Sequence, residues 1–330
     1  MGRKKNDAAF AIVSFEGEPE EVNAQWRAHR KMGLGGSDAG AVLGLNPWRS
    51  PLEVWLEKTG REDSPDLSGK PAVEWGTRLE PKVIEKFAEN HPEFTVERPE
   101  WCAVSKEHPW MFASLDGILR TVGDGGEVIH GVLEVKTAGR DTEWKDGVPA
   151  HYACQVAHYL AVTGWQFAYV AVLIGGQDYR EYRIERDEDD VRALVESESR
   201  FWREFVTADV PPAITGNGDE GAALARMYPE SDGETGIADD MAETLAAEYD
   251  ALAKQEKEIR ERKDKTASML KAIVKDRKAV ESENVKVTWV RTHGFRFNQK
   301  RFQEEMPEEY ARFQDPYSRD GGIRVTIKGA

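Results

Sequence analysis

The spacing of hydrophobic residues changes several times along the chain and predicts alternating helices and strands. Apolar residues recur at helical spacing over 50–60, 73–89, 151–164 and 187–206, and Ser50 is expected to cap the first of these helices. A short helix ending near Gly44 is also expected, with Ser37 or Asp38 as its N-cap. Short alternating runs predict strands over 94–104, 111–120, 131–138, 167–176 and 178–185, with turns between them. Helices on both sides of a set of strands predict a mixed α/β core.

The same patterns predict four parts of the chain. Residues 1–20 are polar without sustained periodicity, so we expect a mobile tail, followed by an α/β domain over 21–210. An acidic segment rich in Gly and Pro predicts a linker over 211–236. In the last part, 237–330, apolar residues recur every seven positions and predict a long helix with a packing seam; they are Leu245, Leu252, Ile259 and Ile273, with Thr266 at the remaining position. We also expect a hairpin around 292–294 and a final strand over 318–329.

Charge is distributed unevenly over the 330 residues. The net charge is −15, which is unfavourable for a protein that handles nucleic acid. However, residues 254–301 contain fifteen Lys and Arg against seven Asp and Glu, whereas 219–250 contain ten Asp and Glu against one Arg. Local surfaces can therefore be basic although the whole chain is acidic.

Other features exclude several classes of protein. No apolar run reaches the roughly 18 residues of a membrane span, and residues 1–21 lack the apolar core of a signal peptide. We therefore expect a cytoplasmic protein without membrane contact. Two cysteines, Cys102 and Cys154, are too few for a disulfide framework, a four-thiolate metal site or an iron–sulfur cluster, so we expect both to be reduced.

The candidate chemistry is found in the segment VLEVKT at 132–137. Alternation along a strand directs Glu134 and Lys136 to one face, where such a pair is most often an ordinary surface ion pair. Asp116 changes this interpretation, because a turn between neighbouring strands would bring it beside Glu134. Two adjacent carboxylates need a proton or a cation, and oxygen ligands favour Mg²⁺ or Mn²⁺ over zinc.

The arrangement Asp116, Glu134, Lys136 resembles the PD-(D/E)XK nuclease signature, with Leu115 in place of its leading Pro. Further motifs over residues 26 to about 210 resemble the YqaJ-like viral recombinase family, which includes the exonuclease of phage lambda. The resemblance implies a restriction-endonuclease-like mixed β-sheet flanked by helices, with the long helix and hairpin as a C-terminal extension. It also implies that residues 21–210 form an exonuclease domain.

The resemblance also implies individual roles. In WGTRLEP, Glu80 matches the helical Glu that reaches the metal, and in CQVAHYLAVTG, Gln155 matches the Gln beside the catalytic Lys. The metal ligands would then be Asp116, Glu134, the Val135 backbone carbonyl and Glu80. In WRAHRKMGLGGS, Arg30 and Ser37 match the residues that hold a terminal 5′-phosphate. The candidate bases His108, His151 and His158 match no family position, and His108, which precedes Pro109, is expected to shape a turn.

The resemblance therefore implies a Mg²⁺-dependent exonuclease that digests linear duplex DNA, in the 5′ to 3′ direction, and exposes single strands for a single-strand annealing protein. One alternative is a noncatalytic module that binds DNA ends or a partner. Another is a Mg²⁺-dependent endonuclease or nickase, and a third is an assembly factor dominated by the long helix. The seam of that helix leaves a homo-oligomer open.

Overall fold

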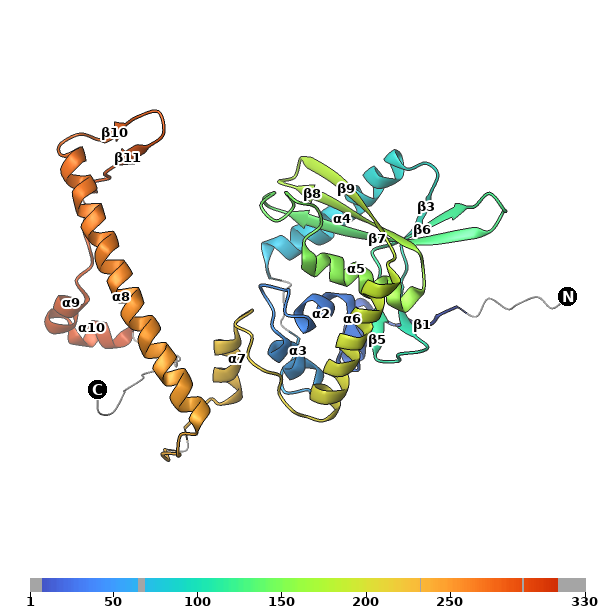
Figure 1. Cartoon of the computed structure of the whole chain (residues 1–330), viewed down its shortest axis with the longest axis horizontal. Helices are drawn as coiled ribbons and strands as arrows, with labels where there is room; N and C mark the ends of the chain where they lie inside the picture. The colour runs from blue at the N-terminus through green and yellow to red at the C-terminus, as the bar shows by residue number, and fades with distance from the viewer. Residues whose placement is uncertain (1–7, 65–68, 232, 293, 314–330) are drawn as a thin grey trace. The chain divides into compact units, whose positions relative to one another are not determined.

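The computed structural model describes residues 8–64, 69–231, 233–292 and 294–313, and the chain divides into two compact units (Figure 1). The first unit is Met1–Met227 and the second is Tyr228–Ala330. Their boundary falls inside the segment predicted as a linker.

The first unit is built around a five-stranded sheet. Its order is β3 (Thr95–Glu97), β6 (Gly117–Val122), β7 (Val128–Ala138), β8 (Phe167–Ile174) and β9 (Asp178–Glu185). The β7–β8 pair is parallel and the other pairs are antiparallel. Helix α4 (Pro71–Asn90) packs on one face and α5 (Ala150–Thr163) on the other. The predicted mixed α/β fold is confirmed.

A second, smaller sheet lies next to the first, in the order β1 (Phe10–Ser14), β4 (Trp101–Ser105), β5 (Met111–Ala113) and β2 (Leu34–Gly35). Two segments predicted as single strands are each divided between the sheets. The segment 94–104 forms β3 and β4, separated at Pro99, which has no backbone N–H for a sheet. The segment 111–120 forms β5 and β6, and the chain crosses from one sheet to the other over 114–116.

The N-terminal region differs from the expected mobile tail over 1–20. Residues 10–14 form β1, which pairs along its whole length with β4, and helix α1 (Pro19–Lys31) begins within the same region. Phe10 stacks on Trp101 with ring centroids 5.8 Å apart, so an aromatic contact fixes this short strand. The pattern was missed because a five-residue edge strand gives little periodicity.

Short helices complete the first unit. Ser50 caps α3 (Pro51–Lys58) as predicted, and its hydroxyl accepts a hydrogen bond from the Glu53 N–H at 3.2 Å. Helix α2 (Gly36–Val42) has Gly35 as its N-cap. The expectation that Ser37 or Asp38 caps this helix is therefore wrong. Helix α6 (Glu188–Phe201) continues into the π-helix η1 (Trp202–Thr207). Helix α7 (Glu220–Met227) lies within the predicted linker and packs on α3 through Ala223.

Helices α5 and α6 are joined by a buried ion pair. His158 is fully buried, its Nδ1 lies 2.9 Å from both Glu198 carboxylate oxygens, and its Nε2 lies 2.9 Å from the Phe112 carbonyl oxygen. Both ring nitrogens therefore face acceptors, which suits the doubly protonated imidazolium. Burial opposes this charge, but Glu198 outweighs it and raises the pKa of His158.

We expect this pair to make the stability of the protein depend on pH. Because the pKa of His158 is raised on folding, its contribution is complete below the unfolded value of about 6.5 and is lost as the pH rises through the folded value. The slope is at most about 1.4 kcal/mol per pH unit. Urea unfolding at several pH values should show this decrease in the wild type and not in His158→Gln. Parallel curves for the two proteins would contradict the prediction.

The second unit is a long helix with small elements at its side. Helix α8 (Asp240–Val274) is followed by the strands β10 (Ala279–Glu281) and β11 (Lys286–Thr288) and the helices α9 (Gln299–Glu305) and α10 (Pro307–Arg312). The hairpin turn falls over 282–285, upstream of the expected 292–294, and the strand expected over 318–329 lies outside the described residues. Among the described helices, none is both long and apolar enough to cross a membrane.

The predicted seam of α8 is exposed in the single chain. Leu252 and Ile259 have exposed fractions of 56% and 62%, and Leu245 and Ile273 are similar. We therefore expect α8 to take part in self-association. Leu252→Asp with Ile259→Asp should lower the mass measured by light scattering to that of one chain, because two charges enter the seam. Ala247→Asp, on another side of the helix, should leave the mass unchanged. An oligomer that survives the double substitution would exclude the seam.

Candidate active site

The middle of β7 carries Glu134 and Lys136 on one face. Val132 packs toward α5, whereas Leu133 and Val135 pack toward α4, so alternation directs Glu134 and Lys136 toward α5. Glu134 is 1% exposed, and its Oε1 accepts a hydrogen bond from Lys136 Nζ. Burial disfavours the charge on Lys136, but Glu134 outweighs this effect and the pKa of Lys136 is raised. Lys136 is therefore a cation held beside a buried carboxylate.

Asp116 lies at the crossing between the two sheets. Its Oδ2 accepts a hydrogen bond from the Val135 N–H at 2.8 Å, so the structure brings Asp116 to the part of β7 that holds Glu134. Burial and the nearby Glu134 charge raise the pKa of Asp116 well above its usual range. Two carboxylates thus share a site that disfavours two uncompensated negative charges.

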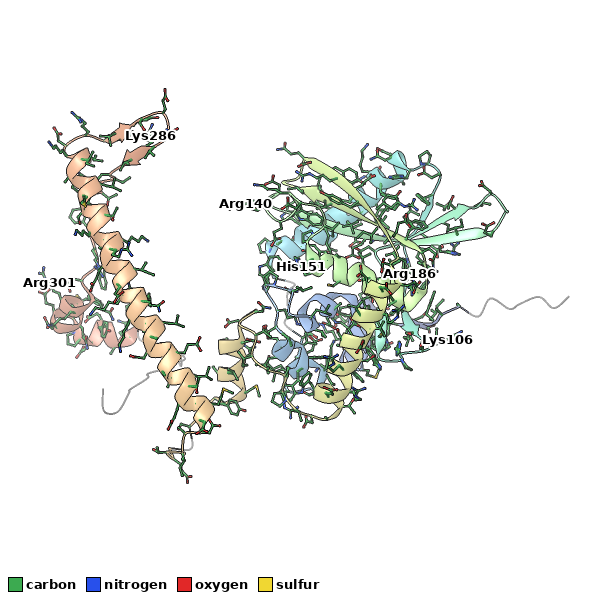
Figure 2. The ribbon with its side chains drawn as sticks, in the orientation of Figure 1. Lys106, Arg140, His151, Arg186, Lys286 and Arg301 are labelled. Carbon is green, nitrogen blue, oxygen red and sulfur yellow. The ribbon has the colours of Figure 1, made fainter. Side chains whose placement is uncertain are left out.

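Helix α5 supplies the groups that hold this pair in place. Gln155 Oε1 accepts a hydrogen bond from Lys136 Nζ at 3.1 Å, and Gln155 Nε2 donates to Glu134 Oε1 at 2.8 Å. The same Nε2 lies 2.8 Å from the Tyr159 hydroxyl, and the Tyr152 ring lies 4.6 Å from Lys136 Nζ. The Gln155 amide therefore contacts both Glu134 and Lys136. The segment that connects β7 to α5 can be followed in Figure 2, where Arg140 and His151 lie near its two ends.

Glu80 lies on α4 and is directed to a different partner. Its Oε1 pairs with the Arg98 guanidinium, although its charge is close enough to raise the pKa of Asp116 further. Across the residues that the structure describes, no three His, Cys, Asp or Glu side chains converge as a metal site. The predicted set of Asp116, Glu134 and Glu80 is thus only partly assembled in this conformation.

The donor chemistry of the centre nevertheless fits a hard divalent cation. Glu134 Oε2 is buried and has no hydrogen-bond partner, which is costly for a carboxylate oxygen unless a cation or proton approaches it. Burial and the Glu134 charge raise the pKa of Asp116, which favours a proton or a cation at this carboxylate as well. Asp116 and Glu134 would be the main ligands of such a cation. Glu80 could join them only after its ion pair with Arg98 is broken.

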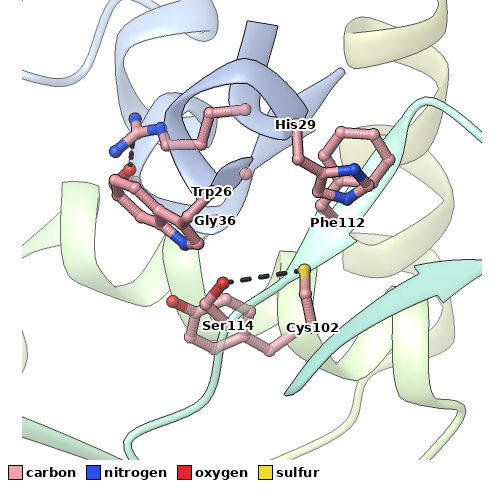
Figure 3. Close-up of a pocket in the computed structure, with 10 residues that line it drawn as sticks. Trp26, His29, Gly36, Cys102, Phe112 and Ser114 are labelled. Atoms are coloured by element: carbon pink, nitrogen blue, oxygen red, sulfur yellow. Dashed lines mark hydrogen bonds between the residues drawn. The ribbon is translucent and has the colours of Figure 1, made fainter. Parts of the chain in front are cut away.

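A cavity of about 190 Å³ lies beside this centre and contains the predicted phosphate-binding residues (Figure 3). Arg30 Nη2 donates to Ser37 Oγ at 3.2 Å, so the two predicted residues are in contact. Arg30 Nε is buried without a hydrogen-bond partner, although it lies 3.8 Å from Glu57 Oε1. At Gly36 a Cβ would lie 2.4 Å from the Tyr159 ring, so only glycine allows this close packing.

Two residues connect the cavity with the carboxylate centre. Tyr159 lines the cavity and also contacts Gln155 through its hydroxyl. Ser114 lines the cavity as well, and its hydroxyl donates a hydrogen bond to Cys102 Sγ at 3.6 Å (Figure 3). Two residues further on, Asp116 reaches Val135. The two sites therefore share one short segment and one helix.

Several important residues were not predicted from the sequence. Ser114 and Tyr159 carry no local signal, since a serine at a strand end and a tyrosine on an apolar helix face are common. Glu57 and Lys58 are buried charges at the end of α3. The sequence does contain a signal for Glu57 and Lys58. Helix α3 is apolar on most sides, which predicts a buried helix, and charges on a buried helix must be paired.

The remaining sequence predictions concern histidine and cysteine. His108 shapes a turn as expected, and its carbonyl accepts a hydrogen bond from the Met111 N–H at 2.8 Å. His151 has a buried Nε2 without a hydrogen-bond partner, and its ring makes an edge-to-face contact with the Trp48 ring. Cys102 and Cys154 are both free thiols, as predicted.

Comparisons with known proteins agree with the motifs. A model of the YqaJ-like viral recombinase domain matches residues 25–166. The uncharacterized protein YqaJ of Bacillus subtilis (strain 168) is 29% identical over 307 residues, which cover 91% of this chain and 93% of that protein. The crystal structure of LHK-Exo in complex with dAMP aligns with a TM-score of 0.45 and 19% identity, over 62% of this chain and 97% of that chain. The alkaline exonuclease LHK-Exo from Laribacter hongkongensis aligns with a TM-score of 0.43 and 18% identity, over 62% and 100%.

The domain model and the relative that aligns along nearly the whole chain both agree with the resemblance predicted from the motifs. The chain is therefore similar to the YqaJ-like viral recombinase domain over residues 25–166, and to YqaJ along most of its length.

Proposed function

We propose that this protein is a metal-dependent exonuclease that hydrolyses duplex DNA from a 5′-phosphorylated end. The observation that supports this most directly is the short connection between the two sites. Ser114 lines the cavity that holds Arg30 and Ser37, and Asp116 faces Glu134. Two residues of extended chain span at most about 7 Å, which is the scale of a single nucleotide. A terminal phosphate in the cavity would place the next phosphodiester near the carboxylates.

Asp116, Glu134 and the Val135 carbonyl would hold one or two Mg²⁺ ions, or Mn²⁺, with Glu80 as a further ligand. Such an ion supplies an activated water and stabilises negative charge on the phosphate during hydrolysis. The unpartnered Glu134 Oε2 and the raised pKa of Asp116 support this role.

The side chains of the protein would do the remaining work. Lys136 keeps its proton and can orient a water or contact a phosphate oxygen as negative charge develops. Gln155 fixes Lys136 and Glu134 at a constant separation through its two hydrogen bonds. Arg30 offers Nε and a permanent charge to an anion, and Ser37 adds a hydroxyl. In this proposal, hydrolysis and recognition of the end fall to different side chains.

The wider setting is proposed on the family resemblance alone. Digestion from one end of a duplex leaves a single strand, which suits a single-strand annealing protein as the partner. The reaction would take place in the cytoplasm of a bacterial host cell.

The experiment that tests the function uses one duplex sequence in three forms. Linear DNA with a 5′-phosphate, the same DNA with a 5′-hydroxyl and a covalently closed circle are incubated with the protein, with Mg²⁺ or with EDTA. We expect rapid release of label from the phosphorylated linear DNA, slow release from the hydroxyl form, and no cleavage of the circle or in EDTA. Cleavage of the circle would indicate an endonuclease, and binding without cleavage would indicate a noncatalytic module.

A further inference from the structure

A cluster of five charged side chains lies directly behind the phosphate cavity. It consists of Arg30, Asp38, Arg49, Glu57 and Lys58, called here the buried charge cluster. The side chains of Asp38 and Lys58 are 0% exposed, that of Glu57 is 3% exposed, and those of Arg49 and Arg30 are 19% and 23% exposed. Charges this deep in a protein are retained only when their partners are well placed.

Asp38 is the centre of this cluster. Its Oδ1 accepts hydrogen bonds from Arg49 Nη1 at 2.6 Å and from Arg30 Nη2 at 3.2 Å. Its Oδ2 lies 2.8 Å from Lys58 Nζ and accepts a hydrogen bond from the Gly35 N–H at 3.0 Å. One carboxylate therefore contacts three cations and the backbone at the start of α2.

The cluster contains one positive charge in excess. Burial favours the neutral form of Asp38, but Lys58, Arg49 and Arg30 outweigh it and hold the pKa of Asp38 well below its usual range. The pKa of Glu57 is also lowered, because Arg49 and Lys58 outweigh its burial. Three cations thus face two carboxylates. Arg30 is the member that lines the cavity, so the excess charge is available to an anion there.

We propose that Asp38 is a positioning residue for recognition of the DNA end, which holds the Arg30 guanidinium in the orientation that receives a terminal phosphate. This proposal rests on the proposed function of the cavity. Asp38 contacts Nη2, and Nε remains without a hydrogen-bond partner. Arg30 is thereby anchored at Nη2, while Nε, 3.8 Å from Glu57 Oε1, makes no hydrogen bond. Lys58 Nζ also donates to the Arg30 carbonyl at 2.9 Å, so the cluster holds the backbone of Arg30 as well.

The test is a binding measurement that requires no cleavage. Two fluorescent hairpin duplexes that differ only in a 5′-phosphate or 5′-hydroxyl are titrated in EDTA, and anisotropy gives the ratio of their Kd values. We expect a preference for the phosphate in the wild type and a roughly tenfold smaller ratio in Asp38→Asn, because a neutral amide no longer anchors Arg30. Glu220→Gln is the matched control, since it neutralises a buried carboxylate that bonds to the Thr215 and Gly216 N–H groups and to no member of the cluster. It should keep the ratio within about twofold of the wild type.

A double substitution separates positioning from a general structural role. If Asp38 acts through Arg30, Asp38→Asn should not change the ratio further in an Arg30→Ala background. A structural role would instead weaken both duplexes equally and lower the melting temperature. Equal weakening, an unchanged ratio in folded Asp38→Asn, or additive effects would each overturn the proposal.

A second variant covers the case in which Asp38→Asn does not fold. Asp38→Glu keeps the charge that Lys58 and Arg49 need but displaces the carboxylate by about 1.5 Å. We expect a smaller ratio with a melting temperature near that of the wild type, and an unchanged ratio would overturn the proposal. If the wild type binds both duplexes equally, the proposed recognition of the 5′ end is wrong as well. If the protein binds the phosphorylated duplex preferentially but does not cleave DNA, the proposed nuclease activity is wrong and the role of Asp38 in binding still stands.

Discussion

Lys136→Ala is expected to lower the rate of Mg²⁺-dependent DNA cleavage by about 10²- to 10⁴-fold. Lys136 is the cation of the centre, and it is held between Glu134 and Gln155. Without it, a water or a developing negative charge beside the carboxylates loses its nearest positive side chain. The rate is measured by release of end label from linear duplex. Lys145→Ala, an exposed lysine in the segment between β7 and α5, is the matched control.

Glu134→Gln should have the same effect on cleavage by a different route. The amide keeps the size of the side chain but replaces a charged oxygen ligand, so the affinity for Mg²⁺ should fall together with the rate. Calorimetric titration with Mg²⁺ separates the two variants, because Lys136→Ala leaves both carboxylates in place. Circular dichroism establishes that each variant is folded. Near-normal cleavage by either folded variant would remove that residue from the reaction.

Arg30→Ala is expected to reduce digestion of 5′-phosphorylated duplex by roughly one to two orders of magnitude, since charge-assisted hydrogen bonds contribute about 1.5 to 3 kcal/mol. Digestion of the 5′-hydroxyl duplex should change little, because that end has no phosphate for the cavity to bind. The initial rates on the two substrates are compared at the same DNA concentration. The two rates should become similar in the variant.

The control for this variant is Arg27→Ala, on the same helix but outside the cavity. It should preserve the difference between the two ends. If the wild type digests both ends equally, or if Arg30→Ala loses both activities equally, Arg30 is not a phosphate-binding residue. Equal loss would point to a structural role in the buried charge cluster.

The sequence predicted the centre better than its surroundings. Alternation along β7 was sufficient to place Glu134 and Lys136 on one face, because the period of a strand is fixed by its backbone. The contact of Asp116 with Val135 required the turn between β6 and β7, which the pattern also contained. Family motifs identified Gln155, Arg30 and Ser37, and the structure brings each of them to one of the two sites.

The errors arose where distant segments decide the structure. The split of 111–120 between two sheets depends on pairing partners, β4 and β7, that a local pattern does not specify. The pairing of Glu80 with Arg98 joins α4 to the segment between β3 and β4. Asp38 looked like a helix cap, and only its contacts with Arg49 and Lys58 distinguish it from one. Such contacts between remote residues leave no periodic signal.

The order of the elements along the chain has a consequence for how this protein could diverge. β6, β7, α5 and β8 follow one another along the chain, so the residues from Asp116 to Gln155 belong to one continuous stretch. The cavity is instead assembled from α1, α2, the smaller sheet and α5. Helix α2 packs tightly on α5 at Gly36 and Gly40, whereas Arg30 and Trp26 reach the cavity from α1. Under the proposed function, substitutions in α1 would therefore alter which DNA ends are accepted without changing the reactive stretch, so that the preference for an end would drift faster in evolution than the reaction itself.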